Sequence, residues 1–315
     1  MERTALILGA TGGIGGAVAR RLLASGWTVR GLARAGGIAA MPMGVERLVG
    51  DAMTAADVIR AAEGADLIVH GVNPPGYRNW GRLVLPMIDN TIAAARANGA
   101  RVLLPGTVYN YGPDAPALIG EDAPQRPLTR KGAIRVEMER RLQAAAAAGE
   151  MSVLIVRAGD FFGPDARQSW FSQGLVQPGK RPRIIRNPSR RGVGHQWAYL
   201  PDVAETMVRL IETGGLDPFA TFHMEGMWDD DGTRMTSAIV RALGDPTVPV
   251  ARLPWWAIRL AALVATTPRE MLEMRYLWER PVRMTNARLR AHLGAEPHTP
   301  LDEAVRATLA GLGCL

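Results

Sequence analysis

Residues 4–19 read TALILGATGGIGGAVA, which is an apolar strand pattern followed by a glycine-rich turn and the start of a helix. Glycines stand at 9, 12 and 15, in the spacing Gly-x-x-Gly-x-x-Gly. Glycine permits a tight turn, close approach of the backbone to a pyrophosphate, and close packing of helix on strand. The free N–H groups of the helix start then face the anion. The pattern predicts a dinucleotide-binding loop made of Gly9, Thr11, Gly12, Gly13, Ile14 and Gly15.

The end of the second predicted strand, residues 27–33, indicates which dinucleotide binds. An acidic residue at this tip would hold the adenosine ribose hydroxyls of NAD. Arg34 stands there instead, and no acid follows until Glu46. An arginine removes the repulsion of a 2′-phosphate and offers it a forked donor, so the sequence favours NADP over NAD, with NAD left open. After the third predicted strand come Asp51, which could accept a hydrogen bond from the adenine amino group, and Ala52.

Composition limits the class of protein. The 315 residues are 47% hydrophobic, enough for one large core with a smaller one attached. The single cysteine, Cys314, excludes a disulfide framework, and the five histidines lack metal-ligand spacing. The first strand begins almost at residue 1, leaving no room for a signal peptide. We therefore expect a cytoplasmic protein without a metal centre.

Two segments raise the question of partners. The formal net charge is +7, and residues 180–191 carry a local cluster of basic side chains. That cluster could hold an anionic substrate or a nucleic acid, or it could be a solvated hairpin. It contains no aromatic residue for base stacking, so we expect no nucleic acid partner.

Residues 253–266 are the most apolar stretch, but they are too short to span a bilayer and contain Arg259. We expect a buried or pocket-lining helix there, and no membrane partner.

Strand and helix patterns alternate through the first half of the chain. Strands are predicted at 4–9, 27–33, 46–49, 66–72, 101–106 and 152–157, and helices at 14–25, 55–62, 82–98 and 131–148. The nearly continuous apolar strands are typical of a parallel sheet covered on both faces. This alternation predicts an α/β, Rossmann-type doubly wound sheet.

The pattern breaks up after Gly159, and a helix resumes at 200–211. We predict a dinucleotide domain over residues 1–160, to which 196–212 returns. Residues 161–195 and 213–315 are predicted to form a smaller, mainly C-terminal substrate lobe, with short helices at 233–243, 255–265, 268–278 and 301–309.

Several motifs resemble those of one known family. GATGGIG at 9–15 is similar to its cofactor loop, and Gly50-Asp51 to its adenine contact. PGTVYNYG at 105–112 resembles its fifth strand and the following loop. RAGDFFGP at 157–164 and YLPDVA at 199–204 resemble the Arg-x-x-Asn-x-Tyr-Gly-Pro and Asp-Val-Ala segments. On these motifs the chain resembles the extended short-chain dehydrogenase/reductases, also called the NAD-dependent epimerase/dehydratase family. The resemblance covers most of the chain and implies a Rossmann fold, a nicotinamide cofactor and hydride transfer.

The resemblance also implies candidate catalytic residues. In that family a Ser or Thr four residues before the Tyr-Gly pair hydrogen-bonds the reacting oxygen, and this position is Thr107. The family's Tyr-x-x-x-Lys pair is missing. Counting back from Glu139, which fits the acid after that lysine, places Arg135 at the lysine position and Lys131 at the tyrosine position. Residues four apart share a helix face, so both can point toward the cofactor.

The missing tyrosine leaves the proton donor open. Arg135 can hold ribose or phosphate but cannot transfer protons near neutrality. Lys131 could serve as the acid or base if burial and the neighbouring Arg135 lower its pKa. Tyr109 or Tyr111 could supply the proton instead. Alternatively, the two basic residues could form a solvated face of a site that has lost its chemistry.

The substrate side departs from the family as well. Members acting on nucleotide sugars carry an arginine seven residues before the Asp of the Asp-Val-Ala segment, and that position is His195, a weaker and pH-dependent anion partner. His195 and Phe162 are therefore our candidate substrate-binding residues, beside tryptophans and Phe171 that suggest an aromatic-lined pocket.

The leading hypothesis is an NADP(H)-dependent oxidoreductase of the atypical short-chain type, acting on a small carbonyl or alcohol. The alternatives are a sugar epimerase or dehydratase, and a non-catalytic NADP-binding sensor. The only partner we expect is a small-molecule substrate, and a homodimer is left open.

Overall fold

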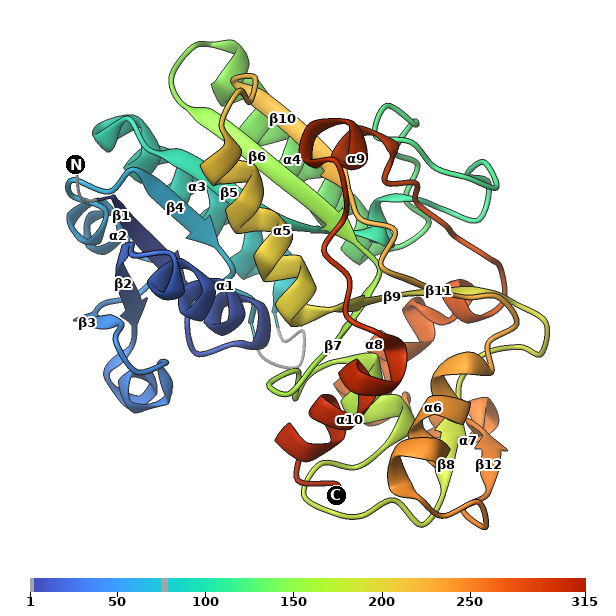
Figure 1. The fold of residues 1–315 in the computed structure, drawn as a ribbon. Helices are drawn as coiled ribbons and strands as arrows, with labels where there is room; N and C mark the ends of the chain where they lie inside the picture. The colour runs from blue at the N-terminus through green and yellow to red at the C-terminus, as the bar shows by residue number, and fades with distance from the viewer. Residues whose placement is uncertain (1–2, 75–78) are drawn as a thin grey trace.

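Seven parallel strands form the central sheet of the computed structural model, which describes residues 3–74 and 79–315 (Figure 1). The strand order is β10-β6-β5-β4-β1-β2-β3. The strands are β1 (Thr4–Leu8), β2 (Thr28–Ala33), β3 (Glu46–Val49), β4 (Leu67–His70), β5 (Arg101–Thr107), β6 (Ser152–Ala158) and β10 (Phe219–His223). The chain order reverses between β1 and β4, so the carboxyl ends of the strands flank a switch point, where ligands bind in open α/β sheets.

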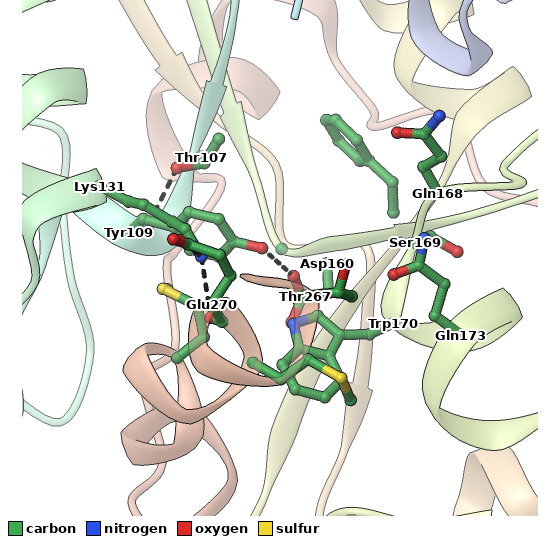
Figure 2. A pocket seen from close by; sticks show the side chains of 14 residues that line it. Thr107, Tyr109, Lys131, Asp160, Gln168, Ser169, Trp170, Gln173, Thr267 and Glu270 are labelled. Carbon is green, nitrogen blue, oxygen red and sulfur yellow. Dashed lines mark hydrogen bonds and ion pairs between the residues drawn. The ribbon is translucent and has the colours of Figure 1, made fainter. Parts of the chain in front are cut away.

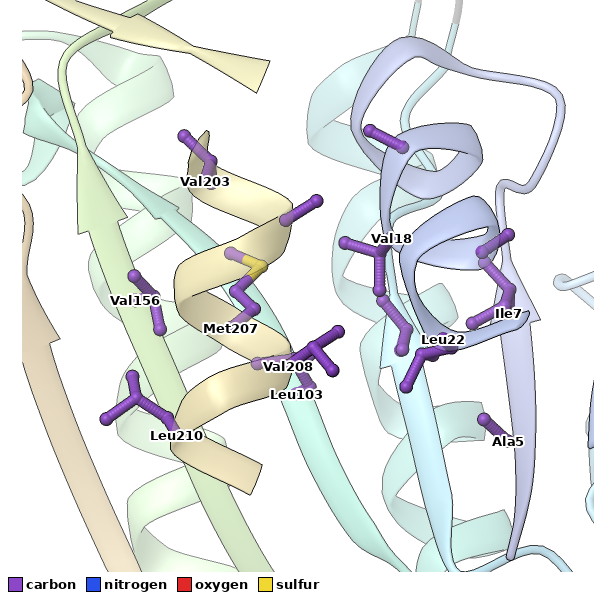
Figure 3. Packing of buried hydrophobic residues seen from close by; sticks show 14 of the residues in the cluster. Ala5, Ile7, Val18, Leu22, Leu103, Val156, Val203, Met207, Val208 and Leu210 are labelled. Carbon is purple, nitrogen blue, oxygen red and sulfur yellow. The ribbon is translucent and has the colours of Figure 1, made fainter. Parts of the chain in front are cut away.

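Helices cover both faces of this sheet. On one face lie α1 (Gly13–Ala24) and α5 (Leu200–Thr213), which pack against each other. Figure 3 shows Val18 and Leu22 of α1 beside Met207 and Val208 of α5, above strand residues such as Val156. On the other face α2 (Ala55–Ala61), α3 (Trp80–Asn98) and α4 (Arg130–Ala147) enclose a second apolar cluster. Burial on both faces explains the continuous apolar strands, and the predicted doubly wound Rossmann sheet is confirmed.

The smaller lobe contains short strands and helices. A three-stranded sheet is made of β7 (Asp160–Phe162), β9 (His195–Tyr199) and β11 (Met227–Asp229), and a two-stranded one of β8 (Ile185–Asn187) and β12 (Val250–Arg252). Around them lie α6 (Arg234–Leu243), α7 (Trp255–Ala261), α8 (Thr266–Glu273), α10 (Leu301–Gly311) and the 3-10 turn Arg275–Trp278. The lobe core contains Phe162, Phe171, Trp197 and Trp278.

Two parts of the C-terminal region differ from the sequence prediction. Strand β10, assigned to the substrate lobe, is the edge strand of the central sheet and pairs with β6. Helix α9 (Ala287–Leu293), which was not predicted, packs on β10 and α5. Residues 213–315 are therefore shared between the two parts of the molecule, because a five-residue strand beside an existing sheet edge carries little sequence signal.

The apolar segment 253–266 is exposed over much of its length, whereas its composition predicts a buried or pocket-lining helix. Helix α7 covers its first half, and no residue of α7 is fully buried. Trp256 is 70% exposed and Val264 is 91% exposed. Within the described residues, no helix has both the length and the apolar character needed to cross a bilayer.

Candidate functional site

The glycine loop connects β1 to α1 at the carboxyl edge of the sheet. Gly9 has a φ of +92°, and a Cβ there would lie 2.6 Å from the Gly71 backbone. A Cβ on Gly15 would lie 2.2 Å from the Gly9 carbonyl oxygen, so helix and turn touch directly. Gly12 is the N-cap of α1, and no side chain caps it. The first N–H groups of α1, at Gly13 and Ile14, are therefore suited to bind an anion. Thr11 precedes them in the same turn.

The residues predicted to contact the adenosine half follow the next two strands. Arg34 comes directly after β2 and is exposed. Asp51 follows β3, and its main-chain N–H donates to Asp57 Oδ2 at 3.0 Å while its own Oδ1 accepts from the Met53 N–H at 3.0 Å. The Ala52 carbonyl accepts from Asn90 Nδ2 at 2.9 Å. Because these strands are parallel, Arg34 and Asp51 lie at the same sheet edge as the glycine loop.

A small pocket lies between this sheet edge and the smaller lobe, with a volume of about 100 Å³. Figure 2 shows Thr107, Tyr109 and Lys131 on one side of it and Gln168 and Gln173 on the other. The remaining lining residues are Gly159, Asp160, Phe161, Ser169, Trp170, Thr267, Glu270, Met271 and Met274. The structure thus places three of the five predicted catalytic residues around one cavity.

Tyr109 and Asp160 are joined inside the pocket. The Tyr109 hydroxyl donates to Asp160 Oδ1 at 2.8 Å, and the Tyr109 main-chain N–H donates to Thr107 Oγ1 at 3.1 Å. Since the Thr107 oxygen accepts that bond, its own O–H is still able to donate to a ligand. Asp160 is 5% exposed, and its second oxygen lies 3.0 Å from His195 Nε2. The result is a buried chain of polar groups that ends at the pocket.

Lys131 is held at the pocket by the smaller lobe. It is 2% exposed, and its Nζ donates to the Glu270 carbonyl oxygen at 2.8 Å and pairs with Glu270 Oε2 at 2.8 Å. Glu273 lies 3.8 Å away and also accepts the Lys131 main-chain N–H, next to the Thr129 cap of α4. Burial lowers the pKa of the Lys131 ammonium, and the two carboxylates oppose that shift. The predicted burial is present, but the charged neighbours that act on the pKa of Lys131 are glutamates and not Arg135.

Arg135 lies one turn further along α4 and is not among the residues that line the pocket. Its guanidinium stacks over the Trp80 ring at 5.2 Å from the centroid. Burial, assisted by the Arg135 charge, lowers the pKa of the nearby His70 to about 3. Lys131 and Arg135 therefore do not form a solvated basic face, because Lys131 is buried and Arg135 packs against an aromatic ring.

Tyr111 lies outside the pocket in a buried network. Its hydroxyl accepts from Arg157 Nη1 at 3.0 Å and contacts His223 Nε2 at 3.1 Å. Arg157 is paired with Glu139, and both are buried. Burial raises the pKa of Tyr111 to about 12. These contacts tie the loop after β5 to α4, β6 and β10, which is a structural role for a residue that was predicted as a proton donor.

The two predicted substrate-binding residues are buried in the lobe. His195 Nδ1 lies 3.3 Å from the Leu277 carbonyl oxygen, and the ring stacks on Trp278 with centroids 3.7 Å apart. With Nε2 facing Asp160, both ring nitrogens face protein acceptors, so His195 supports the pocket wall without lining it. Phe162 is fully buried and stacks on Phe171, and the pocket is lined by its neighbour Phe161 instead.

Sequence reasoning missed the contribution of α8. Glu270, Met271 and Thr267 reach the pocket from a helix more than 100 residues further along the chain, and nothing in their local pattern indicates this. Asp160 had a detectable signal. It begins β7, two residues after the end of β6, at the sheet edge where the other strand-end residues lie.

Comparisons with known proteins show the family of this chain. The sequence profile of the NAD-dependent epimerase/dehydratase family matches residues 5–218. The chain belongs to this family. Membership supports a nicotinamide dinucleotide as the cofactor, and the glycine loop fits its pyrophosphate because α1 begins at Gly12 with no side chain capping its first N–H groups.

A sequence relative and several solved structures resemble this family member. The uncharacterized protein y4nL of Sinorhizobium fredii is 32% identical over 213 residues, which are 60% of each chain. The UDP-glucose 4-epimerase of Thermotoga maritima, solved with UDP-glucose, has a TM-score of 0.77 at 14% identity, with 98% of both chains covered. The enzyme WbmH of Bordetella bronchiseptica, solved with NAD+, has a TM-score of 0.73 at 18% identity and covers 99% of this chain and 98% of its own. At these identities the structures show a shared fold.

Proposed function

We propose that this protein is an NADP(H)-dependent oxidoreductase that transfers a hydride between the nicotinamide and a small carbonyl or alcohol. The observation that carries the proposal is the grouping of Thr107, Tyr109 and Lys131 around one pocket at the carboxyl edge of the sheet. When bound, the reduced cofactor supplies the hydride for the carbonyl carbon. The chain's own residues must then orient the carbonyl oxygen and supply its proton.

Two groups divide this work in the proposal. The Thr107 hydroxyl donates a hydrogen bond to the substrate oxygen and stabilises the charge that develops on it. The Lys131 ammonium, in the position of the family's tyrosine, gives its proton to that oxygen. Burial lowers the pKa of Lys131 and so brings this group closer to the range in which it can act as an acid. Tyr109, whose hydroxyl proton is directed at Asp160, is the competing donor.

The preference for NADP rests on Arg34. Its guanidinium follows β2 directly, where an acid would exclude a 2′-phosphate, and it is exposed. A forked, permanently charged donor at this position favours the phosphorylated ribose. Arg135 would assist in holding the nicotinamide ribose from the first turns of α4.

A sugar epimerase or dehydratase is the second candidate, favoured by family membership. The burial of His195 speaks against a nucleotide-sugar substrate, because both of its ring nitrogens face protein acceptors and neither is directed at a diphosphate. The cavity volume of about 100 Å³ also suits a small substrate better.

The test measures NADPH oxidation, as the loss of NADPH absorbance, in the presence of a panel of small aldehydes and ketones. Wild-type protein should turn over at least one of them, and Thr107→Val should lower turnover roughly tenfold to a thousandfold. Lys131→Met should abolish turnover while NADPH binding, measured by calorimetry, persists. Arg135→Met should chiefly weaken that binding.

The outcomes separate the hypotheses. If Lys131→Met stays active and Tyr109→Phe is inactive, the proton comes from the loop after β5. If NADPH binds but no carbonyl is reduced, and none of these variants changes the behaviour, the sensor hypothesis replaces the enzyme. Turnover of a UDP-sugar without net NADPH consumption would support the epimerase.

A further inference from the structure

Helix α7 and the turn that follows it present an apolar stripe to the solvent. Trp256, Leu260, Leu263 and Val264 are 70%, 61%, 81% and 91% exposed. They recur at helical spacing, and the turn after α7 continues the helical hydrogen bonding, with the Leu263 N–H donating to the Leu260 carbonyl at 3.2 Å. The four side chains therefore lie along one side of α7 and the turn that follows it. A contiguous group of exposed apolar side chains marks an interaction site on a folded protein.

Basic residues flank this stripe in the sequence and lie across the pairing of β12 with β8. Residues 246–269 contain no acid and include Arg252, Arg259 and Arg269. Strand β12, just before α7, pairs with β8 and so places Ala251 opposite Arg186. Residues 180–191, which include β8, also contain no acid and carry Lys180, Arg181, Arg183, Arg186, Arg190 and Arg191.

The two segments form one surface of the lobe. The Leu253 N–H donates to the Asn187 carbonyl at 2.8 Å, and Trp255 Nε1 donates to the Pro188 carbonyl at 3.2 Å. In Figure 1, β8, β12 and α7 lie together at the end of the smaller lobe remote from the N-terminus. Within the described part of the chain, no carboxylate lies within ion-pair distance of any of the nine basic residues. We call this combined surface the α7 surface.

We propose that the α7 surface binds an anionic lipid membrane, with α7 lying in the interface. Interfacial helices combine an apolar face rich in tryptophan and leucine with flanking basic residues, which is the composition found here. An interfacial helix lies along the bilayer surface, so α7 does not need the length of a membrane span.

The charges select this occupant over two others. A second copy of the chain would bring two clusters of arginines against each other in an isologous contact, and the like charges would repel. A nucleic acid would satisfy the arginines but leave Leu260, Leu263 and Val264 without apolar contacts. An anionic bilayer interface satisfies both the basic and the apolar side chains.

The experiment is co-sedimentation of the full chain with vesicles of phosphatidylcholine alone and of phosphatidylcholine mixed with phosphatidylglycerol. We expect binding to the mixed vesicles only, with a blue shift of tryptophan fluorescence. The double variant Trp256→Ser, Leu263→Ser should lower partitioning about tenfold or more. The double variant Arg252→Gln, Arg259→Gln should lower it about fivefold for each arginine.

Matched controls lie on the dinucleotide domain. Met43→Ser removes a side chain that is 92% exposed, and Arg47→Gln removes an exposed arginine of β3, so both should leave partitioning unchanged. NADPH binding and circular dichroism report whether each variant folds. The proposal is overturned if the folded wild type sediments with neither kind of vesicle, or if the controls lower vesicle binding as much as the α7 variants. It is also overturned if the α7 variants leave vesicle binding intact but abolish DNA binding or a concentration-dependent dimer.

Discussion

The contact between Glu270 and Lys131 offers the sharpest test of the proposed acid. The Glu270 carboxylate opposes the lowering of the Lys131 pKa by burial, so Glu270→Gln should lower that pKa further. The amide keeps the shape of the side chain, and the main-chain carbonyl of residue 270 still accepts from Nζ.

The size of the effect follows from the separation of the charges. At the 2.8 Å between Nζ and Oε2, two unit charges attract by about 1.5 kcal/mol in water-like surroundings and by about 6 kcal/mol at an effective dielectric of about 20. Lys131 is buried, while Glu270 is 21% exposed and Glu273 remains nearby, so the lower value is the minimum that we expect. Since about 1.4 kcal/mol corresponds to one pKa unit, the pKa of Lys131 should fall by about one unit or more.

The assay is the pH dependence of kcat/KM for carbonyl reduction. Reduction needs the ammonium form, so the rate is lost as pH rises through the pKa of Lys131. In Glu270→Gln that loss should occur about one pH unit lower or more. The control Glu63→Gln removes an exposed acid after α2 and should leave the profile unchanged. Superimposable profiles for wild type and Glu270→Gln would refute the assignment of Lys131 as the acid under the influence of Glu270.

Three further predictions concern the cofactor and the fold. Arg34→Asp should reverse a preference for NADPH over NADH, and equal affinity of the wild type for both in calorimetry would remove the argument from Arg34. Gly12→Val should abolish cofactor binding without unfolding the protein, because a Cβ there meets only the Gly9 oxygen, at 3.3 Å. Gly15→Val should also lower the melting temperature, because its Cβ would lie 2.2 Å from that oxygen. Burial lowers the pKa of His70 and of His223 to about 3, so the unfolded chain binds more protons below pH 6.5. The free energy of unfolding should therefore be highest above pH 6.5. It should fall by up to about 1.4 kcal/mol per pH unit for each histidine as pH drops toward 3. Urea unfolding at about pH 7 and about pH 5 tests this, and equal stability at the two pH values would contradict it.

The dinucleotide half was predictable because its signals are local. The strand, the glycines and the helix that form the phosphate loop lie within sixteen consecutive residues, and each apolar strand is recognisable without knowledge of its neighbours. The position of Thr107 followed from its motif, and the structure places it at the pocket. Arg34 and Asp51 also follow directly from the ends of their strands.

What the sequence could not determine depends on contacts between distant residues. Lys131 was identified as a candidate, but its glutamate partner is 139 residues away and comes from a helix with no distinguishing pattern. His195 looked like a substrate contact until the fold placed Asp160 and Trp278 against its ring. The apolar segment around α7 looked buried, because hydrophobicity predicts burial only on average. Local periodicity determined the strands and helices of the dinucleotide half, but not β10 or α9. The packing of distant elements decided which side chains meet, because burial and charge pairing depend on neighbours in space.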